Sequence, residues 1–149
     1  MPPGPNWAAG ALAVALAAAT PAAGQSAHTL YLLKCSGCHR ADGLGAPDAG
    51  VPRFPGFVGD LARDGDGRIY MLHVPGVAGS NLPNAELSAV LNYVLDKWAP
   101  APSDGVKRFT PAEVDALRAL KINDIVAYRR TLVARLRKSG AAIADYPWP

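Results

Sequence analysis

Both cysteines of the chain lie in one short stretch, Cys35-Ser-Gly-Cys38, and His39 follows immediately. Two thiols at this spacing can form a redox-active dithiol, provide half of a zinc site, or attach a haem. A dithiol of the thioredoxin type requires a preceding strand in an α/β fold, and no strand-like alternation precedes this motif. A zinc site requires further ligands, usually as a second Cys/His pair, whereas His28 and His73 are far apart and singly placed.

The third chemistry accounts for all three residues, because C-x-x-C-H is the attachment signal of covalent c-type haem. Two thioether bonds must reach two vinyl groups on one edge of a flat macrocycle, and two intervening residues on a turn of helix set the sulfurs that far apart. The next histidine then lies under the iron and provides the proximal imidazole. The sequence therefore predicts one covalent haem c, attached through Cys35 and Cys38 and ligated by His39.

Residues 1–24 are predicted to be a signal peptide. The uncharged, mostly alanine run 8–19 is too short to span a bilayer, and Pro21 and the small residues 22–24 follow it as a cleavage site. The segment before this run lacks Lys and Arg, so an uncleaved anchor is the alternative. Cleavage predicts a periplasmic chain without a membrane span. Export normally favours a disulfide, but a two-residue loop would be a poor structural staple.

The remaining chain is predicted to be helical around a long irregular segment. Residues 25–39 are expected to form a helix, whereas 42–67 is rich in Gly and Pro and predicts loops and turns. Such a long loop is unusual in a compact domain, but it is expected if it wraps a haem. A helix is predicted over 83–98 because apolar residues recur there at helical spacing, namely Leu87, Val90, Leu91, Val94, Leu95 and Trp98.

The last third of the chain, residues 99–149, is predicted to be a Pro-rich linker followed by a basic helical extension. Thr110 to Glu113 has the pattern of a capping box and begins a short helix, and a second helix is predicted over 124–139. The predicted apolar stripes contain Val114, Leu117, Leu120, Ile125, Leu132, Val133 and Leu136. Residues 103–140 hold nine Lys or Arg and four acidic side chains, a net +5, whereas residues 1–102 sum to −1.

The sequence YLLKCSGCHRADGLGAPDAGVPRFPGFVG resembles the start of a small bacterial class I cytochrome c. The resemblance covers roughly residues 25–98 and implies an all-α fold, with helices and loops wrapped around one haem and a final helix packed across the first. It implies that Tyr31 meets this final helix, with Tyr93 as its partner. It also implies that the Pro52 carbonyl accepts the N–H of the proximal histidine. The tail after Ala99 lies outside this pattern and adds a C-terminal helical extension.

The resemblance also implies a methionine as the distal iron ligand. After the start codon, the chain contains one methionine, Met71, which lies 32 residues beyond His39 and ahead of the final helix. Met71 is therefore our candidate metal ligand, His73 is its rival, and an open or water-bound iron is the third alternative. Arg68 could pair with a haem propionate, or it could be a solvated side chain.

These inferences predict periplasmic electron transfer by a mono-haem cytochrome whose partners are redox proteins, with no role in nucleic-acid binding. The chain is then an electron carrier and not an enzyme in its own right. Two alternatives stay open: a cytochrome subunit of a periplasmic dehydrogenase complex, and a five-coordinate haem protein that binds ligands or reacts with peroxide. The basic tail is either a solvated helix face or a docking surface for an acidic redox partner, and its apolar stripe could pack back onto the haem domain.

Overall fold

The computed structural model describes residue 1 and residues 24–99 and 106–144. The elements in chain order are α1 (Ala27–Lys34), α2 (Ser36–His39), the 3-10 helix η1 (Pro47–Ala49), α3 (Val58–Arg63), α4 (Gly65–His73), α5 (Pro75–Ala78), α6 (Asn84–Trp98), α7 (Pro111–Arg118) and α8 (Ile125–Lys138). No strand forms within the described ranges, where Ala46 and Val51 make one isolated bridge, so the predicted all-α class is confirmed. Most of the predicted signal peptide and linker lies outside the described residues, and the domain boundaries at 24 and 98 stay predictions.

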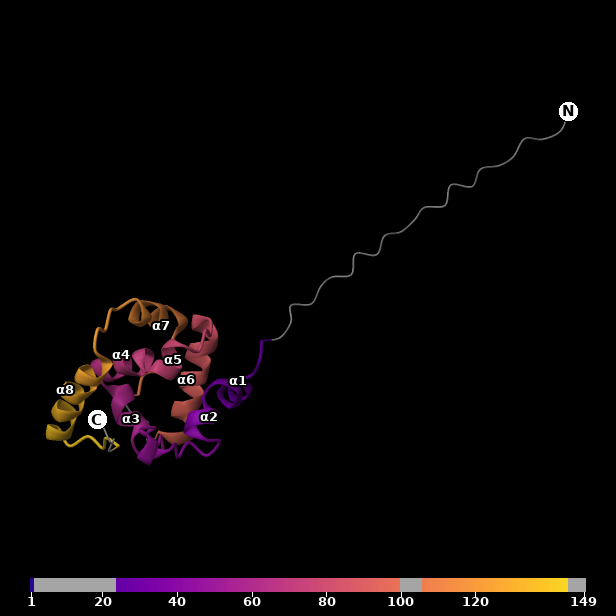
Figure 1. Ribbon diagram of the computed structural model, residues 1–149. Helices are drawn as coiled ribbons and strands as arrows, with labels where there is room; N and C mark the ends of the chain where they lie inside the picture. Colours follow the sequence, from indigo (N-terminus) through magenta and orange to yellow (C-terminus); the bar gives the residue numbers. More distant parts are fainter. Residues whose placement is uncertain (2–23, 100–105, 145–149) are drawn as a thin grey trace.

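The helices α1 and α6 lie side by side (Figure 1). Aromatic side chains make part of the contact between them. The Tyr31 side chain is fully buried, and its ring centroid lies 5.5 Å from that of Tyr93 and 5.1 Å from that of Trp98. The Tyr31 hydroxyl donates a hydrogen bond of 2.6 Å to the Arg40 carbonyl, just beyond the cysteine motif. The expected contact between Tyr31 and the helix that carries Tyr93 is confirmed.

Two sequence-based predictions of local structure need correction. The single helix expected over 25–39 is broken at Cys35, whose backbone (φ −120°, ψ −36°) ends α1 and begins α2. The loop expected over 42–67 contains α3 and the beginning of α4. The Asp64 side chain caps α4 by accepting a bond of 2.9 Å from the Gly67 amide. Gly67 is required here, because an added Cβ would lie 2.1 Å from the Leu61 carbonyl oxygen.

The start of the C-terminal extension packs into the same hydrophobic core as the first 98 residues. Phe109 and Val114 are 3% and 0% exposed and belong to the cluster that contains Tyr31 and the buried face of α6. The Thr110 hydroxyl caps α7 as predicted, by accepting a bond from the Glu113 amide. Leu120 was predicted in the buried stripe, but its side chain is 44% exposed and that prediction is wrong.

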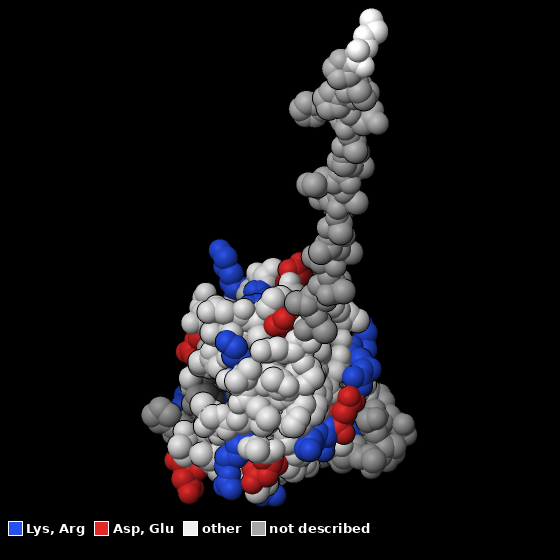
Figure 2. Space-filling view, turned by 90° about the vertical axis from the view of Figure 1, so that its right-hand side faces the viewer, with Lys and Arg blue, Asp and Glu red and all other residues white. Residues whose placement is uncertain are grey.

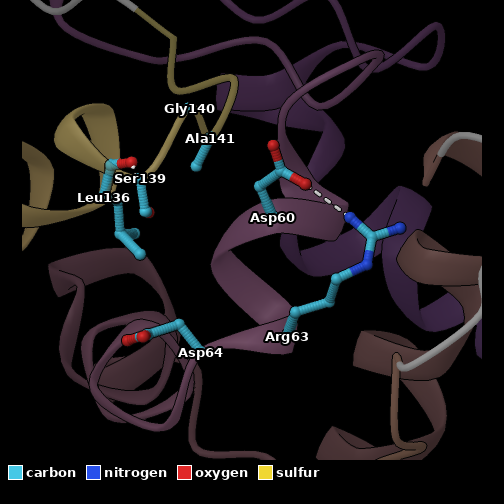
Figure 3. A pocket seen from close by; sticks show the side chains of 7 residues that line it. All are labelled: Asp60, Arg63, Asp64, Leu136, Ser139, Gly140 and Ala141. Carbon is cyan, nitrogen blue, oxygen red and sulfur yellow. Dashed lines mark hydrogen bonds and ion pairs between the residues drawn. The ribbon is translucent and has the colours of Figure 1, made fainter.

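The last helix, α8, lies against α4 on the opposite side of the molecule from α1 (Figure 1). A second apolar cluster joins them and contains Tyr70, Leu132, Leu136 and Ile143. Beyond the end of α8, the Ala142 amide donates to the Asp60 side chain on α3. Asp60 also pairs with Arg63 on the same helix (Figure 3). The predicted helices of the extension therefore exist, and both pack back onto the preceding elements. Among the described helices, none is both long and apolar enough to cross a membrane.

We predict that Phe109→Ala lowers the free energy of unfolding by about 3–5 kcal/mol, because it removes a large buried side chain and leaves a cavity. Leu120→Ala, in the same extension, should change it by less than about 0.5 kcal/mol, because that side chain is largely exposed. Denaturant unfolding followed by circular dichroism measures both values. Equal, small effects would show that the extension does not contribute to the core.

Candidate haem site

The two cysteines and the histidine lie on the single helical turn that Cys35 and α2 form, directly after α1. The Cys38 and His39 amides both donate to the Cys35 carbonyl, over 3.2 and 2.9 Å. Both thiols are free; that of Cys35 is half-buried and that of Cys38 is exposed. Burial, with a smaller contribution from Cys38, raises the pKa of the Cys35 thiol. The turn therefore holds two free sulfurs next to the imidazole.

The His39 ring is held by one hydrogen bond and one aromatic contact. Its Nδ1–H donates to the Pro52 carbonyl over 3.3 Å, as the resemblance implies. The ring also stacks on Phe54, with centroids 4.1 Å apart and planes inclined by 17°. Burial lowers the pKa of His39, against an opposing contribution from the bond to Pro52, and so favours the neutral imidazole that binds metals. Because Nδ1 carries the proton, Nε2 is the nitrogen that can bind iron.

The Pro52 carbonyl is positioned by a tightly folded loop. The Gly45 amide donates to the His39 carbonyl over 3.0 Å, and the Phe54 amide donates to the Gly43 carbonyl over 2.8 Å. Gly45 has φ +63°, and an added Cβ would lie 2.5 Å from the Val51 oxygen and 2.7 Å from the Pro52 oxygen. Only glycine fits this position without displacing the acceptor of the His39 bond.

Met71 lies on the interior side of α4. Two neighbours on this helix define its buried side: Arg68 bonds to Glu113 on α7, and Tyr70 packs in the cluster with α8. At about 100° per residue, Met71 falls between these two directions. Its side chain is 8% exposed, the largest value among the buried members of the main core cluster.

His73 is placed differently from Met71. Its Nδ1 lies 2.8 Å from the Ile69 carbonyl oxygen, and its Nε2 lies 2.8 Å from the Leu120 carbonyl oxygen. Both ring nitrogens therefore face backbone acceptors, one on its own helix and one beyond the end of α7.

Arg68 is not the solvated side chain that one of the two sequence-based interpretations assigned to it. Its side chain is buried, so it is not solvated, and all three of its nitrogens are bonded within the protein. Its carboxylate partner within the protein is Glu113, and pairing with a haem propionate stays a prediction.

Curated proteins of one bacterium, Thermus thermophilus, are similar to this chain. Its cytochrome c-552 is 32% identical over 120 residues, and the alignment covers 66% of this chain and 91% of the relative. The cytochrome c-552 of a named strain of the same species is also 32% identical over 120 residues, with 80% of its length covered. The chain belongs to the c-type cytochromes. No family model matches it.

Membership confirms the resemblance to this family and the cytochrome c fold, and it implies covalent haem c and electron transfer. The local structure of this cytochrome fits that group. Two free thiols lie on one turn, and the adjacent imidazole presents Nε2 because Nδ1 is bonded to Pro52. In the part of the chain that the structure describes, no cluster of three or more His, Cys, Asp or Glu side chains could hold a bare metal ion.

Sequence reasoning missed two features that shape the site. The first is Phe54, which stacks on His39; an aromatic residue two positions after Pro52 in a Gly/Pro-rich loop was the available signal. The second is the pairing of Arg68 with Glu113, which are 45 residues apart. No local pattern predicts a contact at that separation.

We predict that Gly45→Ala destabilises the cytochrome by about 1–3 kcal/mol more than Gly56→Ala, because the new Cβ overlaps two carbonyl oxygens at the first position only. Gly56 is a matched control: it also has positive φ, +81°, but nothing lies within 4 Å of its added Cβ. Denaturant unfolding of both variants gives the comparison. If the two lose equal stability, the loop can move the Pro52 carbonyl without penalty, and our account of the loop is wrong.

Proposed function

We propose that this cytochrome carries single electrons between redox proteins, through one haem c attached at Cys35 and Cys38 with His39 as the proximal ligand. The observation that carries the proposal is the His39–Pro52 hydrogen bond, which orients a neutral imidazole beside two free thiols. When bound, the haem supplies the one-electron chemistry. The chain's own residues hold it at one edge, orient the imidazole and limit access of water.

We further propose Met71 as the distal ligand. Its buried position on the interior side of α4, ahead of the final helix, supports this assignment. The two carbonyl contacts of the His73 nitrogens argue against the rival, because Nε2 would have to leave the Leu120 carbonyl. A methionine sulfur favours the ferrous state relative to stronger donors, which suits an electron carrier.

The redox partners are proposed to dock on the face that carries the haem motif. This is the face seen in Figure 2, where charged side chains lie mostly around the margin. Leu33 and Leu44, on either side of the motif, are 63% and 42% exposed, and the Cys38 side chain is exposed. The basic extension is a weaker candidate, because several of its arginines bond to groups of the preceding elements, as Arg108 does to Asp96.

We propose that the protein works in the periplasm. The support is the predicted signal peptide over residues 1–24, which would take the chain across the membrane before it acts. Export also agrees with the use of the cysteine pair for haem attachment. Thiols in an oxidising compartment normally form disulfides, and thioether bonds to the haem prevent this.

Potentiometric titration with optical detection tests this function. We expect one reversible one-electron step in the haem spectrum. Met71→Ala should lower the midpoint potential and abolish the sulfur-to-iron absorption band of the ferric form, because it removes the sulfur donor. His73→Ala should retain the band, because its nitrogens bind carbonyl groups.

Three results would contradict the proposal. An irreversible step, or no step, would exclude an electron carrier. A ferric spectrum that changes only in the His73 variant would make His73 the ligand. A wild-type protein without the sulfur-to-iron band would favour an open or water-bound iron, and with it the ligand-binding alternative.

A further inference from the structure

One of the contacts that link the C-terminal extension to α4 is a partly buried ion pair. Arg68 and Glu113 meet through two parallel hydrogen bonds, Nε to Oε1 over 2.7 Å and Nη2 to Oε2 over 2.8 Å. Their side chains are 7% and 19% exposed. The two-bond arrangement is the strongest geometry available to this pair and fixes direction as well as distance.

The same guanidinium contacts two more segments. Its Nη1 donates to the Ala62 carbonyl at 3.0 Å and to the Lys107 carbonyl at 2.8 Å, and its central carbon lies 3.6 Å from the Phe109 ring centroid. One side chain therefore joins α3, α4, the segment before α7, and α7 itself. The Arg68 guanidinium holds the pKa of Glu113 below its ordinary value, so the carboxylate is charged at neutral pH.

Arg68 and Met71 lie one turn apart on α4, a helix of nine residues. A helix this short has little stability of its own, so its orientation is set by the groups that pack on it. The Glu113 carboxylate holds one side of α4 through Arg68, and the cluster around Tyr70 holds another. Rotation of α4 about its axis would move Arg68 off Glu113 and would turn Met71 at the same time.

We propose that Glu113 is a positioning residue for the distal side of the haem: through Arg68 it holds α4 in the orientation that makes Met71 available to the iron. This inference rests on the proposed ligation by Met71. It gives the C-terminal extension a role in redox chemistry, because the strength of the distal bond then depends on a residue of α7.

A second tail-to-α4 contact provides a matched control. Arg135 on α8 pairs with Asp64 and Asp66 over 2.8 and 2.9 Å, at the beginning of α4. Its side chain is 49% exposed, and exposed pairs of this kind contribute little to stability or position. Arg135→Gln thus removes a charge contact between the extension and α4 without touching the Arg68 cluster.

The experiment is an imidazole titration of the ferric holoprotein, followed at the sulfur-to-iron band. Imidazole binds only where the methionine has left the iron, so its apparent affinity rises with the detached fraction. We expect Glu113→Gln to bind imidazole at least about fivefold more tightly than wild type, the lower end of typical coupling between sites. Arg135→Gln should stay within about twofold of wild type, and Met71→Ala should give the upper limit of affinity.

A second variant covers the case in which Glu113→Gln does not fold. Arg68→Lys keeps the positive charge but lacks the planar guanidinium that makes two parallel hydrogen bonds to Glu113, so this variant should also bind imidazole more tightly than wild type. Unchanged affinity in the folded variant would overturn the inference while leaving Met71 as the ligand. An equal effect in Arg135→Gln would also overturn it, because any loosening of the tail would then suffice. If Met71→Ala does not differ from wild type, the ligation itself is wrong and the inference fails with it.

Discussion

The hydrogen bond from the His39 Nδ1–H to the Pro52 carbonyl fixes the direction in which the imidazole can bind a metal, and much of the structure serves to place its two ends. The donor end depends on the break between α1 and α2, where the Cys35 carbonyl accepts from the Cys38 and His39 amides. The acceptor end depends on a loop that only glycine at position 45 allows. Metal binding tolerates only small errors in the position of the ligand side chain. The chain therefore holds the His39 imidazole through backbone groups of fixed position as well as through side chains.

The C-terminal extension contributes to the same hydrophobic core as the first 98 residues and is not a separate appendage. A buried charge is costly unless it is paired and hydrogen-bonded. Two of the groups that meet this requirement for Arg68 belong to the extension, the Lys107 carbonyl and the Glu113 carboxylate, and the third is the Ala62 carbonyl on α3. Removing Glu113 would leave the buried guanidinium without its counter-charge, which destabilises the folded state. Basic side chains of the tail also make structural contacts: Arg118 bonds to the Leu82 carbonyl and to Asn84, and Arg135 pairs with Asp64. The net positive charge of the tail therefore has a structural component, which composition alone could not separate from steering of a partner.

Local signals in the sequence predicted the parts of the site that are close together along the chain. The attachment motif, the cap at Thr110 and the apolar face of α6 follow from spacing, and the resemblance supplied Pro52. The missed parts depend on contacts between distant segments. A glycine-rich segment predicts a loop, yet Gly67 is buried because α3 and α4 approach closely there. Leu120 has helical spacing but lies beyond the end of α7, so it is not on the apolar face of that helix as the periodicity predicted.

Covalent attachment of the haem at Cys35 and Cys38 is the condition on which the proposed ligands, the electron transfer and the role of Glu113 all depend. The most direct test is the intact mass of the purified protein before and after extraction with acidified acetone. We predict a mass greater than that of the polypeptide by one haem, unchanged by extraction, and a sharp loss of this species when Cys35 or Cys38 is replaced by Ala. A mass equal to that of the bare chain, or haem that the solvent removes from the native protein, would contradict covalent attachment.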